Sequence, residues 1–234
     1  WSDLRPKRWG LHILRGFLSV ALLWCFVYAV SQLSLANAYS IFMSAPLLIT
    51  ALSVPMLREH VGWQQWLAVF VGLVGVIIVL KPSGAGLVTL GGIAALASAI
   101  GYALNAITIR ILTRTDTSAA TVFWSLCFLT IIGGILASAR WVPVPWDYWP
   151  MIVGLGITGA LGQYFITEAR RLAPPPVVAP LEYTGLAWGM LFDWLLWATA
   201  PGLRMLTGAF IIVASGIYVL HRERFASAAL QQQH

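Results

Sequence analysis

The amino-acid sequence predicts an all-α integral membrane protein with eight membrane-spanning helices. Eight apolar stretches of roughly 17 to 23 residues follow one another along the chain, and each is long enough to cross a bilayer as a helix. Hydrophobic residues make up 59% of the 234 residues and charged residues only 9%, with a mean hydropathy of +0.82. A soluble helical protein would need polar faces on most helices, and neither 13–34 nor 64–80 has one.

Residues beside these stretches mark their boundaries. Tryptophan and tyrosine rings favour the headgroup layer of a bilayer, and they stand at Trp63 and Trp66 and again between Trp141 and Trp149. The segment 173–176, Ala-Pro-Pro-Pro, reads as a stiff connector. Backbone groups in lipid must be satisfied within the segment, so each stretch is expected to be helical. The expected helices are, in order, 13–34, 38–57, 64–80, 90–112, 118–139, 149–169, 177–198 and 203–220.

Charged residues predict the orientation of these helices. If the connections are assigned alternately to two sides of a membrane, eleven basic residues fall on the side of the N-terminal segment and three on the other. Cytoplasmic connections are enriched in Lys and Arg, so both ends of the chain are expected in the cytosol, with the protein in the inner membrane. The net charge of +6 is then a topology signal and does not indicate nucleic-acid binding. The eleven basic residues assigned to the cytosolic side are Arg5, Lys7, Arg8, Arg15, Arg58, Arg110, Arg114, Arg170, Arg171, Arg222 and Arg224.

The sequence contains no motif that indicates a metal site, a cofactor site or an ATP site. Cys25 and Cys127 lie mid-span in different helices and are expected to act as small apolar residues. The four histidines follow no metal-binding spacing, and no Walker A motif is present. We therefore predict no cofactor and no metal.

An internal repeat organises the chain. "APLLITALSVPML" at 45–57 aligns with "APLEYTGLAWGML" at 179–191, and 62–80 has a residue pattern similar to that of 202–220. The stretches 90–112 and 118–139 have no partner upstream, which predicts a five-helix unit used twice with the first two helices of the first copy absent. Five is odd, so the copies are expected to have opposite orientations, as in many transporters. The expected division is 1–80 for the first copy, 81–223 for the second and 224–234 for a disordered tail.

The chain resembles the EamA-type permeases of the drug/metabolite transporter superfamily. The resemblance is carried by 35–66, "GVIIVLKP" at 75–82, 179–197 and "GAFIIVASGIYVLHRE" at 208–223. It implies a ten-helix, five-plus-five inverted-repeat bundle that moves a small organic solute by alternating access. The family carries a glutamate that ends the fourth helix of each repeat. That residue is Glu59 in the first copy, where pairing at the helix end is expected, whereas the second copy has Thr199.

Two acidic residues within the spans are the leading site candidates, because an intramembrane charge is costly. Glu182 and Asp193 are eleven residues apart, which places them on one face of a continuous helix together with Gly185 and Gly189. Glu182 is predicted to bind a cationic group of the solute or a coupling proton, and Asp193 is a second candidate for the coupling proton. In the alternative, both carboxylates reach water and the glycines pack against a neighbouring helix.

Further candidates are polar and aromatic side chains on other spans. An aromatic face with hydrogen-bonding groups suits a flat organic solute, although bundle packing and hydrogen bonds between helices explain such residues equally well. Arg170 and Arg171 are interpreted as orientation determinants, with Glu168 as a nearby partner. The sequence leaves open the solute, the direction of transport and homodimer formation. A membrane-embedded enzyme or a non-transporting partner subunit are the alternative functions. The predicted solute-binding residues are Trp24, Tyr28, Gln32, Tyr102, Asn105, Gln163, Glu182 and Trp188.

Overall fold

The described part of the chain is helical throughout, with turns but no strands. The computed structural model describes residues 4, 6–33, 35–80, 88–138, 143–197, 202–203 and 206–218. Five described segments are long and apolar enough to cross a bilayer, and 63–78 and 206–218 are shorter apolar helices. The predicted fold class is therefore confirmed as an all-helical membrane-type bundle. The expected tail at 224–234 lies outside the described residues, as does Thr199.

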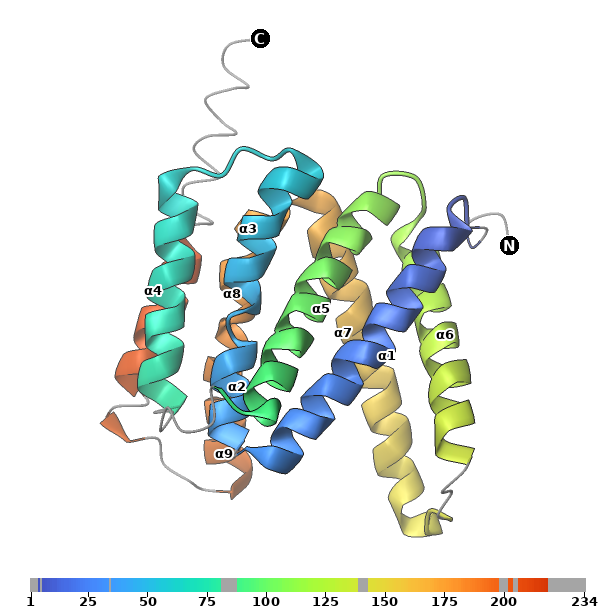
Figure 1. The fold of residues 1–234 in the computed structure, drawn as a ribbon. Helices are drawn as coiled ribbons and strands as arrows, with labels where there is room; N and C mark the ends of the chain where they lie inside the picture. The colour runs from blue at the N-terminus through green and yellow to red at the C-terminus, as the bar shows by residue number, and fades with distance from the viewer. Residues whose placement is uncertain are drawn as a thin grey trace.

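The helices follow the predicted order (Figure 1). They are α1 Trp9–Gln32, α2 Leu35–Phe42, α3 Ala45–Leu57, α4 Trp63–Leu80, α5 Leu90–Leu112, α6 Ser118–Ser138, the 3₁₀ turn η2 Trp146–Tyr148, α7 Trp149–Leu172, α8 Pro175–Glu182 and α9 Thr184–Trp197. A further helix covers 206–218.

Local sequence signals explain several of these boundaries. The Thr89 side chain caps α5 by accepting a hydrogen bond from the Gly92 amide at 3.2 Å. Proline stands in the first turn of α3, α7 and α8, where its missing N–H would be unpaired in any case. Helix α1 begins at Trp9, four residues earlier than predicted, because His12 and Arg15 in its first two turns are buried and bond to Asp116 before α6 and to Thr121 on α6.

Two predicted spans are each broken into two helices. The stretch 38–57 is interrupted at Met43–Ser44, just before Pro46, and 177–198 is interrupted at Tyr183, shortly after Pro180. A proline removes one backbone donor and disturbs the preceding turn, which accounts for the break just before Pro46. The break at Tyr183 follows Pro180, so this effect does not explain its position. The single continuous helix that would align Glu182 with Asp193 is therefore absent, and the side chain of Asp193 lies outside the described residues.

Helix α5 occupies the centre of the bundle and packs against α1, α2, α3, α7 and α8. Small side chains on α5 let these helices approach closely, since Ala95, Ala99, Ala103 and Ala106 are fully buried. Helices α1 and α6 also pack closely. A Cβ at Gly16 on α1 would lie 2.7 Å from Phe128 Cβ on α6. Packing of α5 against the surrounding helices fixes the position of the polar side chains described below.

The helices run alternately between two ends of the bundle (Figure 1). We call the end at which α1, α4, α6 and α8 begin the basic end, because the connections there carry most of the arginines. Helices α1, α2–α3 and α4 run in directions opposite to α7, α8–α9 and helix 206–218 respectively. These directions agree with an inverted repeat, but the ten-helix form of that repeat stays a prediction.

Apolar side chains cover much of the outer surface, as expected for helices that face lipid. On α1 these include Phe17, Trp24 and Val27, which are 64%, 62% and 56% exposed. If two helices are absent from the first copy, we expect an open groove beside 13–34 and 38–57, and its surface would have the same apolar character as a lipid-facing one. The division into repeats and the two additional helices therefore stay predictions.

Candidate functional site

A polar network crosses the otherwise apolar interior near the basic end. It comprises two groups that meet on α5: Arg15 on α1 bonds to Asn105, and Arg170 on α7 bonds to Tyr102 and to Glu182 on α8. Tyr102 and Asn105 are one turn apart on α5, so this single face of the central helix receives a guanidinium from each side. Ionisable groups within membrane spans are the first candidates for function, which makes this network the candidate site.

Arg170 forms the ion pair of this network. Its Nη2 donates to Glu182 Oε1 at 2.8 Å and to the Tyr102 hydroxyl at 2.9 Å. The Arg170 Cζ atom lies 5.2 Å from the centre of the Tyr102 ring, which is cation–π distance. The Arg170 side chain is 4% exposed and that of Glu182 is 13% exposed. Close pairing offsets part of the cost of removing two charges from water, and these two are closely paired.

Arg15 is fully buried and binds neutral acceptors alone. Its Nε donates to Asn105 Oδ1 at 3.3 Å and its Nη1 to the Thr121 carbonyl at 2.6 Å. Asn105 in turn donates to Ser19 Oγ at 2.8 Å. The Arg15 Nη2 atom is buried and has no hydrogen-bond partner among the described residues.

Other polar contacts close the basic end around this network. His12 Nε2 is 2.8 Å from Asp116 Oδ2, both groups are buried, and the Lys7 amide donates to both Asp116 oxygens. Arg110 donates to the carbonyls of Arg170 and Arg171 and lies 3.8 Å from Glu59. The expected pairing of Glu59 at a helix end is thereby confirmed. Burial raises the pKa of the Glu59 carboxyl, and Arg110 and Arg114 oppose that rise.

An aromatic cluster adjoins the network at Tyr102. Phe26 on α1 contacts Tyr39 and Phe42 on α2, with ring centres 5.2 Å apart in each case. Phe42 contacts Tyr102 edge to face, with ring centres 5.5 Å apart. These four rings are partly buried, and the cluster meets the charged network at Tyr102, which belongs to both.

The structure brings three of the predicted site residues together and leaves the others apart. Tyr102, Asn105 and Glu182 belong to the network, and Asn105 forms hydrogen bonds to Arg15 and Ser19 on α1. The remaining predicted residues lie elsewhere, and their contact with a solute stays a prediction. Trp24, Tyr28 and Gln32 are on the exposed face of α1, Trp188 is 59% exposed on α9, and Gln163 is partly buried on α7.

Arg15 and Arg170 were not among the site residues predicted from the sequence. The pairing of Arg171 with Glu168 is confirmed at 3.1 Å, but Arg170 turns inward to Glu182 and is more than an orientation determinant. Adjacent residues on a helix point about 100° apart, so one of the two arginines had to face away from the other. Arg15 was counted as a charge of the N-terminal side although it lies inside a predicted span. An arginine within an apolar stretch was the available signal.

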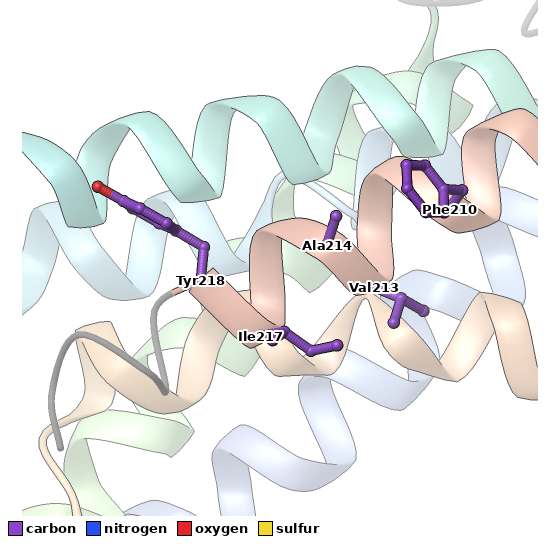
Figure 2. A pocket seen from close by; sticks show the side chains of 5 residues that line it. All are labelled: Phe210, Val213, Ala214, Ile217 and Tyr218. Carbon is purple, nitrogen blue, oxygen red and sulfur yellow. The ribbon is translucent and has the colours of Figure 1, made fainter.

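An apolar hollow on the outer surface lacks charged side chains. Figure 2 shows its lining of Phe210, Val213, Ala214, Ile217 and Tyr218, all from helix 206–218. It offers a single hydroxyl group, on Tyr218, and no charge. A surface of this kind suits lipid chains better than a polar solute. Among the described residues, no group of three His, Cys, Asp or Glu side chains could hold a metal ion.

Comparison with known proteins assigns the chain to a family. The model of the EamA-like transporter family matches residues 1–81 and 89–221. The chain belongs to the EamA-like transporter family. A riboflavin transporter of Vibrio cholerae is 30% identical over 227 residues, which cover 95% of this chain and 75% of that protein. A solved crystal structure shares the fold with a TM-score of 0.79 at 19% identity, over 96% of this chain and 80% of that one.

Two other relatives are named for different solutes and for opposite directions of transport. An S-adenosylmethionine uptake transporter of Rickettsia felis is 25% identical over 96% of this chain and 76% of its own length. A pseudopaline exporter of Pseudomonas aeruginosa is 25% identical over 88% of this chain and 72% of its own length. The chain is therefore a small-solute membrane transporter and not an enzyme, and family membership leaves the solute and the direction open.

Proposed function

We propose that this EamA-like protein transports a flat heteroaromatic solute by alternating access. The observation that carries the proposal is the aromatic cluster of Phe26, Tyr39, Phe42 and Tyr102 beside a buried charged network. Aromatic rings stack on a flat ring system, and a few fixed polar groups orient its substituents. Riboflavin and S-adenosylmethionine, named for two relatives, both contain heteroaromatic rings, which supports this solute class.

The proposed orientation places the basic end in the cytosol of the inner membrane. The charge distribution between connections supports this assignment. Polar contacts such as His12–Asp116 and Glu59–Arg110 join early and late helices at this end. Access from the cytosol requires the early and late helices to separate there, which is the rocking motion expected of inverted-repeat transporters.

Uptake into proteoliposomes tests the solute class. Radiolabelled riboflavin and S-adenosylmethionine are each offered to liposomes with and without the purified protein. We expect saturable uptake of at least one of them, and Phe42→Ala to reduce it about tenfold, which is the effect of losing roughly 1.4 kcal/mol of stacking.

The matched control is Phe210→Ala, because Phe210 is an exposed ring on helix 206–218. It removes the same side chain away from the cluster and is expected to leave uptake unchanged. Absence of protein-dependent uptake of both solutes, or equal losses in the two variants, would contradict the proposed solute class.

A further inference from the structure

The buried guanidinium of Arg15 lacks a counter-ion among the described residues. An arginine stays charged in proteins, so burial does not neutralise it, and an unpaired buried charge costs several kcal/mol. The described carboxylates are engaged or distant. Glu59, Asp116, Glu168 and Glu182 pair with other cationic groups or histidine, and Asp147 lies in η2 at the opposite end of the bundle.

The second buried cation increases the imbalance. Arg170 acts on Arg15 as a like charge, and the two approach the same face of α5 through Tyr102 and Asn105. Among the described side chains, two guanidiniums and the carboxylate of Glu182 leave the network with an excess of one positive charge. In the low dielectric of a membrane interior, such an excess attracts an anion strongly.

Hydrogen-bond donors also outnumber acceptors here. Among the residues that the structure describes, Arg15 Nη2 has no acceptor and the fully buried hydroxyl of Thr167 has no partner. Thr167 is one turn before Arg170 on the same side of α7. The group that would complete the network is thus an acceptor with negative charge, and the planar guanidinium fork fits a carboxylate or a phosphate.

We propose that the transported solute carries a carboxylate or phosphate group and that Arg15, supported by Arg170, binds it. This inference rests on the proposed transport of a heteroaromatic solute, whose ring would contact the aromatic cluster. Arg15 is fully buried in this structure, so the anionic group reaches it in a state in which the helices around Arg15 have separated. A solute with the same ring system but without the anionic group would bind through its ring alone.

Binding of simple anions tests the charge requirement without knowledge of the solute. The purified chain in detergent is titrated with sodium phosphate or sodium acetate, with sodium chloride keeping the ionic strength constant, and its melting temperature is recorded. At least one of the two anions is expected to raise the melting temperature saturably, because a ligand of the folded state stabilises it. The two arms distinguish a phosphate from a carboxylate site.

Variants locate the effect. Arg15→Gln should abolish the rise, whereas Arg171→Gln, which removes an exposed arginine one position from Arg170, should retain it. Asn105→Asp places a carboxylate on the atom position that now accepts from Arg15 Nε. It should raise the melting temperature in chloride alone and weaken the anion effect, which keeps the proposal testable if Arg15→Gln fails to fold.

A matched pair of solutes connects the anion site to transport. Flavin mononucleotide is riboflavin with an added phosphate, so it should stabilise the protein at about tenfold lower concentration than riboflavin, and Arg15→Gln should remove the difference. The proposal is overturned if neither phosphate nor acetate has a saturable effect, or if Arg15→Gln responds as the unsubstituted protein does. Failure of heteroaromatic uptake with an intact anion effect would instead reject the proposed solute ring and leave the anion site standing.

Discussion

At the scale of single residues, the polar groups inside apolar helices were the predictable part of the site. Tyr102, Asn105 and Glu182 stood out in the sequence because a polar side chain in a membrane span needs a partner. Their partners, Arg15 and Arg170, were harder to predict, because positive charges near span ends serve equally well as orientation signals. Only the packing of α1 and α7 against α5 turns these two guanidiniums inward.

The Arg170–Glu182 pair gives the first residue-scale prediction. Glu182→Gln leaves Arg170 buried without a counter-charge, so we expect a loss of about 3–5 kcal/mol in stability together with loss of transport. Glu168→Gln breaks the exposed pair with Arg171 and should cost less than about 1 kcal/mol. Melting temperatures in detergent and uptake rates in proteoliposomes measure the two effects.

A double variant separates a structural role of this pair from a role in transport. Arg170→Gln combined with Glu182→Gln removes both charges and should recover much of the lost stability. We expect transport to remain lost in the stable double variant. Recovery of wild-type uptake would show that the ion pair only holds α7 and α8 together.

At the scale of elements, span order and most boundaries followed from hydropathy, whereas helix breaks and close contacts did not. Pro46 and Pro180 lie within two of the predicted spans and can disturb a helix, but the position of the break at Tyr183 depends on packing around α8. The contact of Gly16 with Phe128 is likewise invisible in the sequence, because it joins two helices about 110 residues apart along the chain.

Glycines on α1 provide the element-scale prediction. Gly16→Ala adds a Cβ that would lie 2.7 Å from Phe128 Cβ, so α1 and α6 must separate, at a cost of about 1–3 kcal/mol. Gly10→Ala on the same helix meets nothing within 4 Å and should be neutral or stabilising by up to about 1 kcal/mol. Opposite shifts in melting temperature are expected. A similar shift for both would mean that the α1–α6 contact is not close in the protein.

At the scale of the whole molecule, the sequence predicted an orientation through its charges and a repeat through "APLLITALSVPML" and its second copy. Opposite helix directions in the two halves agree with the repeat (Figure 1). Hydropathy alone does not reveal how the halves meet. The contacts His12–Asp116, Arg15–Asn105 and Glu59–Arg110 all join an early helix or its flanking loop to a late one near the basic end. These three contacts, which we call the polar seam, lie toward the basic end of the bundle, while Ser98 Oγ donates to the Leu22 carbonyl nearer its middle.

Chemical labelling tests which side of the membrane this basic end faces. In a background with Cys25 and Cys127 replaced by alanine, Val88→Cys and Ala119→Cys each introduce one thiol. Val88 is 95% exposed before α5, and Ala119 is exposed in the first turn of α6 at the basic end. Because basic connections stay in the cytosol, an impermeant maleimide should label position 88 in intact cells and position 119 only after permeabilisation. The reverse pattern would invert the proposed orientation and place the polar seam on the outside. Labelling of both thiols in intact cells would contradict their separation by a membrane-spanning α5.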